Sequence, residues 1–202
     1  LTFIKFDARM QALADIPGAM VGTPTKHEYA IGPRTRAAGT GQVVKITERG
    51  FKAIAEIVAL VRETVGWDVS LCMDHYGHGY LTVKEVIKLA SYLEPYALSW
   101  MEDPMPSLDM WGHKRVTDAV NVPIAGGEDL YLWDQFQPFI ENRAVDIIHP
   151  DLLTSGGMAE TNRIADYAER FGIPTALHFA GSPIAFMANL HTAAALSSFV
   201  AL

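Results

Sequence analysis

Three acidic residues follow short apolar segments at nearly regular intervals along the chain. Asp74 comes after Val-Ser-Leu-Cys-Met, Glu102 after Ala-Leu-Ser-Trp-Met, and Glu128 after Val-Pro-Ile-Ala-Gly-Gly. The intervals are 28 and 26 residues, and each contains one segment with helical periodicity. Carboxylates at equivalent ends of neighbouring parallel strands converge, and such a cluster is best tolerated around a divalent cation. The pattern therefore predicts a metal site made of these three carboxylates.

Two more polar residues continue the repeat. Asp151 follows Ile-Ile-His-Pro, and His178 follows Pro-Thr-Ala-Leu, at intervals of 23 and 27 residues. Near the beginning of the chain, Lys5 and Asp7 lie at the end of the apolar segment 1–6. We expect all these side chains to lie at the carboxyl ends of strands, where parallel barrels build their active sites.

The elements that would position these residues alternate regularly between strand and helix. This alternation, with both sheet faces buried, predicts a parallel α/β fold, and polar residues at every strand end favour a triosephosphate-isomerase-type barrel. The alternative is a doubly wound sheet, which usually shows a Gly-rich phosphate turn that is not found in this sequence. Strands are predicted at 1–6, 69–73, 97–101, 122–125, 144–149, 174–177 and 198–202; helices are predicted at 47–65, 82–93, 107–120, 132–142, 158–171 and 184–196.

A barrel of this type needs eight strands and about 250 residues. The 202 residues supply seven strands at most, so we expect one incomplete barrel domain over 1–202. Residues from about 8 to 44 are rich in Gly, Pro and Thr and predict a long lid-like loop, with a surface insertion as the alternative.

Composition excludes several classes of function. The net charge is −7 and no basic run occurs, which argues against nucleic acid as a partner. No apolar run reaches the ~18 residues needed to span a bilayer, which argues against a membrane protein. The single cysteine, Cys72, lies within a predicted strand and excludes a disulfide framework, so a reducing cytoplasm is the expected compartment.

The ordered set of motifs resembles the enolase superfamily, in particular the acid-sugar dehydratases of its mandelate racemase and muconate lactonizing enzyme type. The resemblance rests on Asp74 and four later motifs in the family's order and spacing. It implies a modified barrel of seven strand–helix units and a final strand, of which this chain would lack the first strand, the end of the last strand and an α+β capping domain. The later motifs are Trp100-Met-Glu-Asp-Pro104, Gly126-Gly-Glu-Asp129, Pro150-Asp151 with Gly156-Gly157, and His178.

The same resemblance implies a chemistry. Mg²⁺ held by Asp74, Glu102 and Glu128 would stabilise the enolate formed when a proton α to a carboxylate is removed. His178, oriented by Asp151, would act as acid or base, with Lys5 as the second such group. The implied reaction is dehydration of a sugar acid by a homo-oligomer. The alternatives are racemisation, epimerisation or cycloisomerisation through the same enolate, or a truncated barrel without activity.

The sequence departs from the family pattern at two places near the expected substrate. Lys5-Phe-Asp7 stands where the family often has Lys-x-Lys, and Tyr76 stands where dehydratases often have a histidine. Asp7, His75, Tyr76 and His78 are therefore the candidate substrate contacts. His149 and His191 are expected to be structural, and Trp100 and Trp111 to serve packing.

Overall fold

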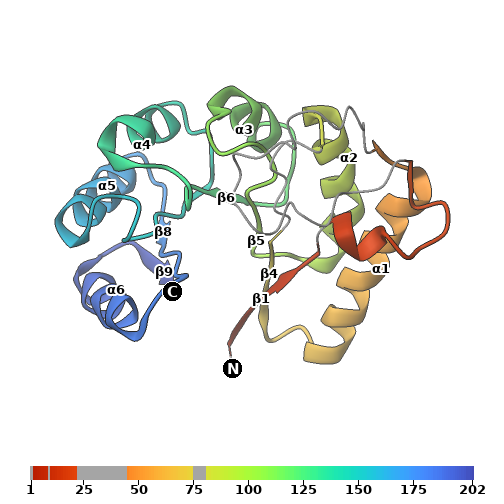
Figure 1. Ribbon diagram of the computed structural model, residues 1–202, viewed down its shortest axis with the longest axis horizontal. Helices are drawn as coiled ribbons and strands as arrows, with labels where there is room; N and C mark the ends of the chain where they lie inside the picture. The colour runs from red at the N-terminus through yellow and green to blue at the C-terminus, as the bar shows by residue number, and fades with distance from the viewer. Residues whose placement is uncertain (1, 9, 22–44, 75–80) are drawn as a thin grey trace. The chain divides into compact units, whose positions relative to one another are not determined.

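Short strands and longer helices alternate along the computed structural model, which describes residues 2–8, 10–21, 45–74 and 81–202 (Figure 1). These residues form two compact units, each with parallel strands and accompanying helices. Among the described residues, no helix is both long and apolar enough to cross a membrane. The first unit comprises Leu1–Pro106 and Ala119–Val122, and the second comprises Ser107–Asp118 and Pro123–Leu202.

Three parallel strands carry the acidic residues of the first unit. Strand β1 pairs with β4, and β4 pairs with β5. The register aligns Asp7 with Asp74 and Asp74 with Glu102, so all three strands end in a carboxylate at the same level. The strands are β1 (Phe3–Asp7), β4 (Ser70–Asp74) and β5 (Trp100–Glu102).

Two amphipathic helices accompany these strands and start at side-chain caps. The Thr47 hydroxyl accepts a hydrogen bond from the Gly50 amide at the start of α1. A capping box starts α2: the Thr82 hydroxyl accepts from the Glu85 amide, and the Glu85 carboxylate accepts from the Thr82 amide at 2.8 Å. The helices are α1 (Glu48–Val65) and α2 (Val83–Leu93), and the 3₁₀ segment η3 (Glu94–Tyr96) follows α2.

A buried arginine ties the end of α1 to the segments that lead into β4 and β5. Arg62 is only 3% exposed, and its guanidinium lies 5.1 Å from the centre of the Trp67 ring. The planar guanidinium carries five N–H donors, and their hydrogen bonds to backbone carbonyl oxygens offset the cost of burying its charge. Arg62 donates to the carbonyl oxygens of Gly66, Val69, Tyr96 and Ala97 at 2.7–3.1 Å.

The single cysteine is chemically protected inside β4. Cys72 has no exposed surface, and burial raises the pKa of its thiol to about 12. Because the thiolate is the reactive form, we expect the native protein to resist alkylation by iodoacetamide at pH 8. Unfolding in guanidinium should then release one reactive thiol per chain. Labelling of the native protein as fast as that of the unfolded chain would contradict this burial.

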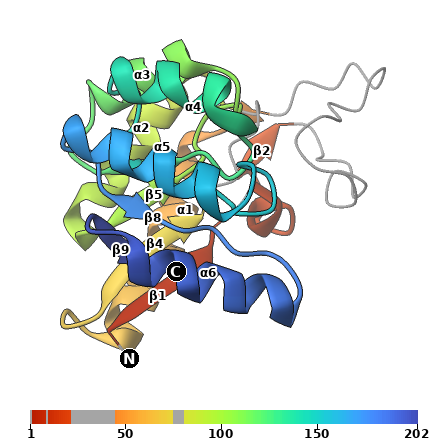
Figure 2. The same cartoon turned by 90° about the vertical axis from the view of Figure 1, so that its left-hand side faces the viewer.

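The second unit contains four parallel strands in the order β6, β7, β8 and β9. Helices α5 and α6 lie side by side and contact each other (Figure 2). The strands are β6 (Ile124–Gly126), β7 (Ile147–Ile148), β8 (Thr175–Ala176) and β9 (Phe199–Ala201); the helices are α3 (Met110–Thr117), α4 (Leu132–Glu141), α5 (Met158–Arg170) and α6 (Pro183–Ala195).

The predicted α/β alternation is confirmed; β4 has the predicted length, and the other strands are shorter than predicted. The predicted helix 107–120 is also shorter, because the Asp109 side chain accepts from the Gly112 amide and thereby sets the first turn of α3. Within the predicted loop 8–44, the described part holds η1 (Met10–Leu13) and β2 (Met20–Val21), and β2 pairs antiparallel with β3 (Lys45–Ile46). Residues 22–44 lie outside the described residues, so the lid-like loop and the single-domain organisation stay predictions.

Candidate active site

Asp74 and Glu102 lie next to each other at the carboxyl ends of β4 and β5. They are register partners, and their exposed fractions are only 5% and 0%. Asp7, the register partner of Asp74 on its other side, is exposed. Carboxylates are rarely buried without compensating charge or hydrogen bonds, so these two strand ends are unusual positions for acidic residues in a purely structural barrel.

Two side chains hold the carboxylate of Glu102. The Lys5 ammonium donates to Oε1 at 2.6 Å, and the Trp100 indole N–H donates to Oε2 at 3.0 Å. The Lys5 side chain keeps 35% of its surface exposed, whereas that of Glu102 has none. A charge-assisted bond from an ammonium compensates part of the cost of burying the carboxylate. Lys5 therefore combines contact with a candidate metal ligand and access to solvent.

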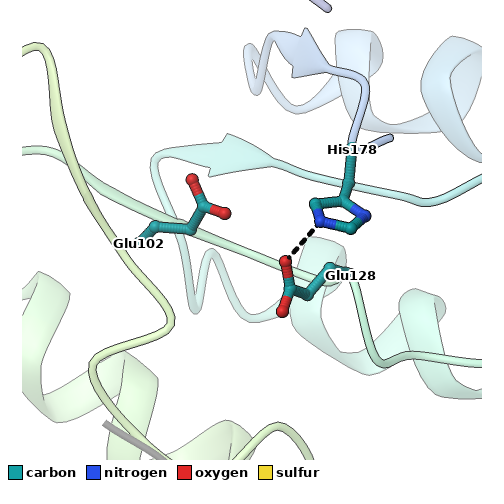
Figure 3. A group of neighbouring side chains, drawn as sticks. All are labelled: Glu102, Glu128 and His178. Carbon is teal, nitrogen blue, oxygen red and sulfur yellow. Dashed lines mark ion pairs between the residues drawn. The ribbon is translucent and has the colours of Figure 1, made fainter. Parts of the chain in front are cut away.

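The second unit brings together Glu128, Asp151 and His178. His178 Nδ1 lies 2.7 Å from Asp151 Oδ2, and His178 Nε2 lies 2.8 Å from Glu128 Oε2. Figure 3 shows the imidazole turned toward Glu128, with the ion pair marked by a dashed line. The contact with Asp151 engages Nδ1, so Nε2 is the ring nitrogen that faces Glu128.

Asp151 is fixed as an acceptor for this imidazole. Burial raises the pKa of its carboxyl group, but hydrogen bonds from His178 and from the Leu153 amide lower it more, so that the pKa lies below its ordinary value of 3.8. The Leu153 amide donates to Oδ1 at 2.7 Å, and an isolated parallel bridge joins the backbones of Asp151 and His178. An ionised Asp151 therefore orients the ring through Nδ1.

His149 supports the same imidazole. It is 3% exposed, its Nδ1 lies 2.9 Å from the Ala176 carbonyl oxygen, and its ring packs edge-on against His178 at 5.4 Å between centroids. Gly127 precedes Glu128 with a φ of 132°, and a Cβ there would lie only 3.1 Å from the Phe136 ring. His149 therefore contacts the candidate base, and its purely structural role stays a prediction.

The other predicted positions divide into three groups. His191 is exposed on α6, as befits a residue without a site role. Trp111 is 63% exposed, whereas Trp100 is buried and, beyond packing, donates to Glu102, a contact that the sequence analysis missed. The candidate substrate contacts in the turn after β4 lie outside the described residues; these are His75, Tyr76 and His78.

The donor set suits a hard divalent cation. Asp74, Glu102 and Glu128 are at most 6% exposed, and each offers carboxylate oxygen, the ligand type that Mg²⁺ prefers. The Lys5 ammonium contacts the Glu102 carboxylate, and the His178 imidazole contacts the Glu128 carboxylate. Each of the three residues therefore has the chemistry and the burial that a magnesium ligand needs.

Sequence comparisons identify relatives of the chain. The family model described as "Enolase C-terminal domain-like" matches residues 34–202. A D-xylonate dehydratase of Haloferax volcanii is 42% identical over 147 residues, which are 73% of this chain and 35% of that protein. An arabinonate dehydratase of Saccharolobus solfataricus is 32% identical over 158 residues, which are 78% of this chain and 42% of that protein.

Solved structures agree on the fold. A mandelate racemase/muconate lactonizing enzyme-like protein from Rubrobacter xylanophilus has a TM-score of 0.75 and 37% identity, over 78% of this chain and 40% of that chain. The 3,6-anhydro-D-galactonate cycloisomerase from Zobellia galactanivorans has a TM-score of 0.70 and 31% identity, over 75% of this chain and 42% of that chain. The predicted barrel-type α/β fold is confirmed. The chain spans 35–42% of the length of these four proteins.

Proposed function

This chain belongs to the enolase C-terminal domain-like family of the enolase superfamily, and on that premise we propose that it serves a Mg²⁺-dependent acid-sugar dehydratase. The observation that carries the proposal is the contact of His178 with both Asp151 and Glu128 at 2.7 and 2.8 Å. In this arrangement, an imidazole that Asp151 orients lies beside Glu128, a buried carboxylate proposed as a metal ligand. Relatives named as D-xylonate and arabinonate dehydratases support this choice of reaction.

Asp74, Glu102 and Glu128 would hold the magnesium ion. The burial of all three residues supports this assignment, as does the placement of Asp74 and Glu102 as register partners at the ends of β4 and β5. When bound, Mg²⁺ supplies positive charge that stabilises the enolate form of the substrate carboxylate. Without such charge, removal of the weakly acidic α-proton would be too slow to be useful.

His178 and Lys5 would handle the protons. The hydrogen bond from Nδ1 to Asp151 leaves Nε2 as the nitrogen that takes the α-proton and later gives a proton to the departing β-hydroxyl. Lys5 Nζ would serve as the second acid or base. Loss of the α-proton and the β-hydroxyl as water gives an enol, which becomes a 2-keto-3-deoxy acid by gaining a proton at C3.

Other parts of the proposal rest on the family and on position. Asp7, His75, Tyr76 and His78 would contact the hydroxyl groups of the sugar acid, since they follow β1 and β4. The protein would work as a homo-oligomer in the cytoplasm, where the buried thiol of Cys72 would remain reduced.

A second candidate function uses the same enolate. The similarity to a cycloisomerase, and to a Roseobacter denitrificans protein described as a putative racemase that is 28% identical, favours isomerisation as the alternative. In that case the enolate would be reprotonated, or attacked within the molecule, without loss of water.

A panel of acid sugars tests the proposed function. The full-length protein with Mg²⁺ should convert at least one aldonic acid to a 2-keto-3-deoxy acid, detected by the semicarbazide reaction of the new keto group. Chelation of the metal should abolish the product. Turnover that survives complete removal of divalent cations would contradict the proposal.

A further inference from the structure

Strand geometry places Trp100 and Glu102 on the same face of β5. Side chains two residues apart in a strand point to the same side, so a Trp-x-Glu sequence at a strand end sets an indole beside a carboxylate. In this strand, Trp100 Nε1 donates to Glu102 Oε2 at 3.0 Å. The exposed fractions of the two residues are 2% and 0%, so water does not compete for this bond.

The indole is itself held in place. Trp100 is the register partner of Cys72 in β4, and its ring packs against that of Phe3 in β1, with 4.9 Å between the centroids. A glutamate side chain has three rotatable torsions, and fixing them costs entropy unless a partner defines the orientation. Trp100 defines that orientation through Oε2, while Lys5 contacts the other oxygen, Oε1.

We infer that Trp100 is a positioning residue for metal binding by Glu102. The inference rests on the proposed role of Glu102 as a ligand and adds a residue that the motif-based assignment treats as packing. The indole N–H is neutral, so it fixes the plane of the carboxylate without adding a positive charge that would repel the cation. Loss of a group that orients a ligand typically weakens metal affinity by about 10–100-fold.

The test compares tryptophan-to-phenylalanine variants of the full-length, metal-free protein. W100F keeps an aromatic ring against Phe3 but removes the N–H donor. W111F is the matched control, because Trp111 is 63% exposed on α3. Titration with Mn²⁺, with free ion measured by electron paramagnetic resonance, gives the dissociation constant and the number of sites separately. We expect W100F to bind with unchanged stoichiometry and about 10–100-fold weaker affinity, and W111F to bind like the unsubstituted protein.

Two outcomes for W100F would overturn the inference. One is an unchanged dissociation constant, and the other is a reduced number of sites with unchanged affinity, which indicates a purely structural role. An E102Q variant separates this inference from the proposed function. If E102Q weakens binding and W100F does not, only the role of Trp100 is lost. If the unsubstituted protein binds no Mn²⁺, or E102Q binds equally well, the ligand assignment and the inference both fail.

Discussion

Replacing His178 with asparagine is expected to lower kcat of the dehydration by about 10²–10⁴-fold, the usual contribution of a positioned general acid or base. Asparagine fits the space but cannot exchange a proton near neutral pH. Asp151 orients the imidazole through Nδ1, so the substitution removes the oriented group that is proposed to exchange a proton with the substrate. Steady-state kinetics on the substrate found in the acid-sugar panel measures the effect.

The matched control is His191→Asn, since His191 is exposed on α6. Its kcat should remain within the experimental error of the unsubstituted enzyme. Circular dichroism of both variants separates loss of chemistry from loss of folding. Turnover by a folded H178N protein at the rate of the unsubstituted enzyme would remove His178 from the catalytic assignment.

Glu128→Gln is expected to weaken Mg²⁺ binding by more than the ~10–100-fold seen when only a supporting group is lost. The substitution keeps the shape of the side chain but removes the negative charge that attracts a hard cation. Glu128 is 6% exposed, so solvent would replace the lost ligand poorly. Isothermal titration of the metal-free protein with Mg²⁺ gives the change in affinity directly.

Glu141→Gln provides the comparison for this variant. Glu141 is an exposed residue at the end of α4, where its carboxylate accepts from Gln137 and Tyr167. It should bind Mg²⁺ like the unsubstituted protein. Equal affinities of E128Q and the unsubstituted protein would show that Glu128 is not a ligand.

The fold could be predicted from sequence because each repeat contains the same signals. A short apolar segment, a polar residue at its end and an amphipathic helix recur often enough to identify parallel strands and their carboxyl edge. Local chemistry set some boundaries as well, such as the capping box of Thr82 and Glu85. Most strand lengths were overestimated, since apolar residues also flank the hydrogen-bonded pairs, as at Val122 and Ala144.

Side-chain contacts were less accessible to sequence reasoning. The placement of Asp151 beside His178 followed from the strand repeat, but the contact of His178 with Glu128 depends on side-chain rotamers. Trp100 could have been recognised, because a Trp-x-Glu pair in a strand shares one face. No local signal marked His149, whose role arises from packing between residues distant in sequence.

Proton exchange in D₂O tests the central claim most directly. The full-length protein, Mg²⁺ and the panel of acid sugars are incubated together and followed by proton NMR. The account predicts loss of the α-proton signal together with a new C3 methylene that carries one deuterium, as expected for a 2-keto-3-deoxy acid. Recovery of a sugar acid with deuterium at the α-carbon and no loss of water would contradict dehydration and establish isomerisation instead.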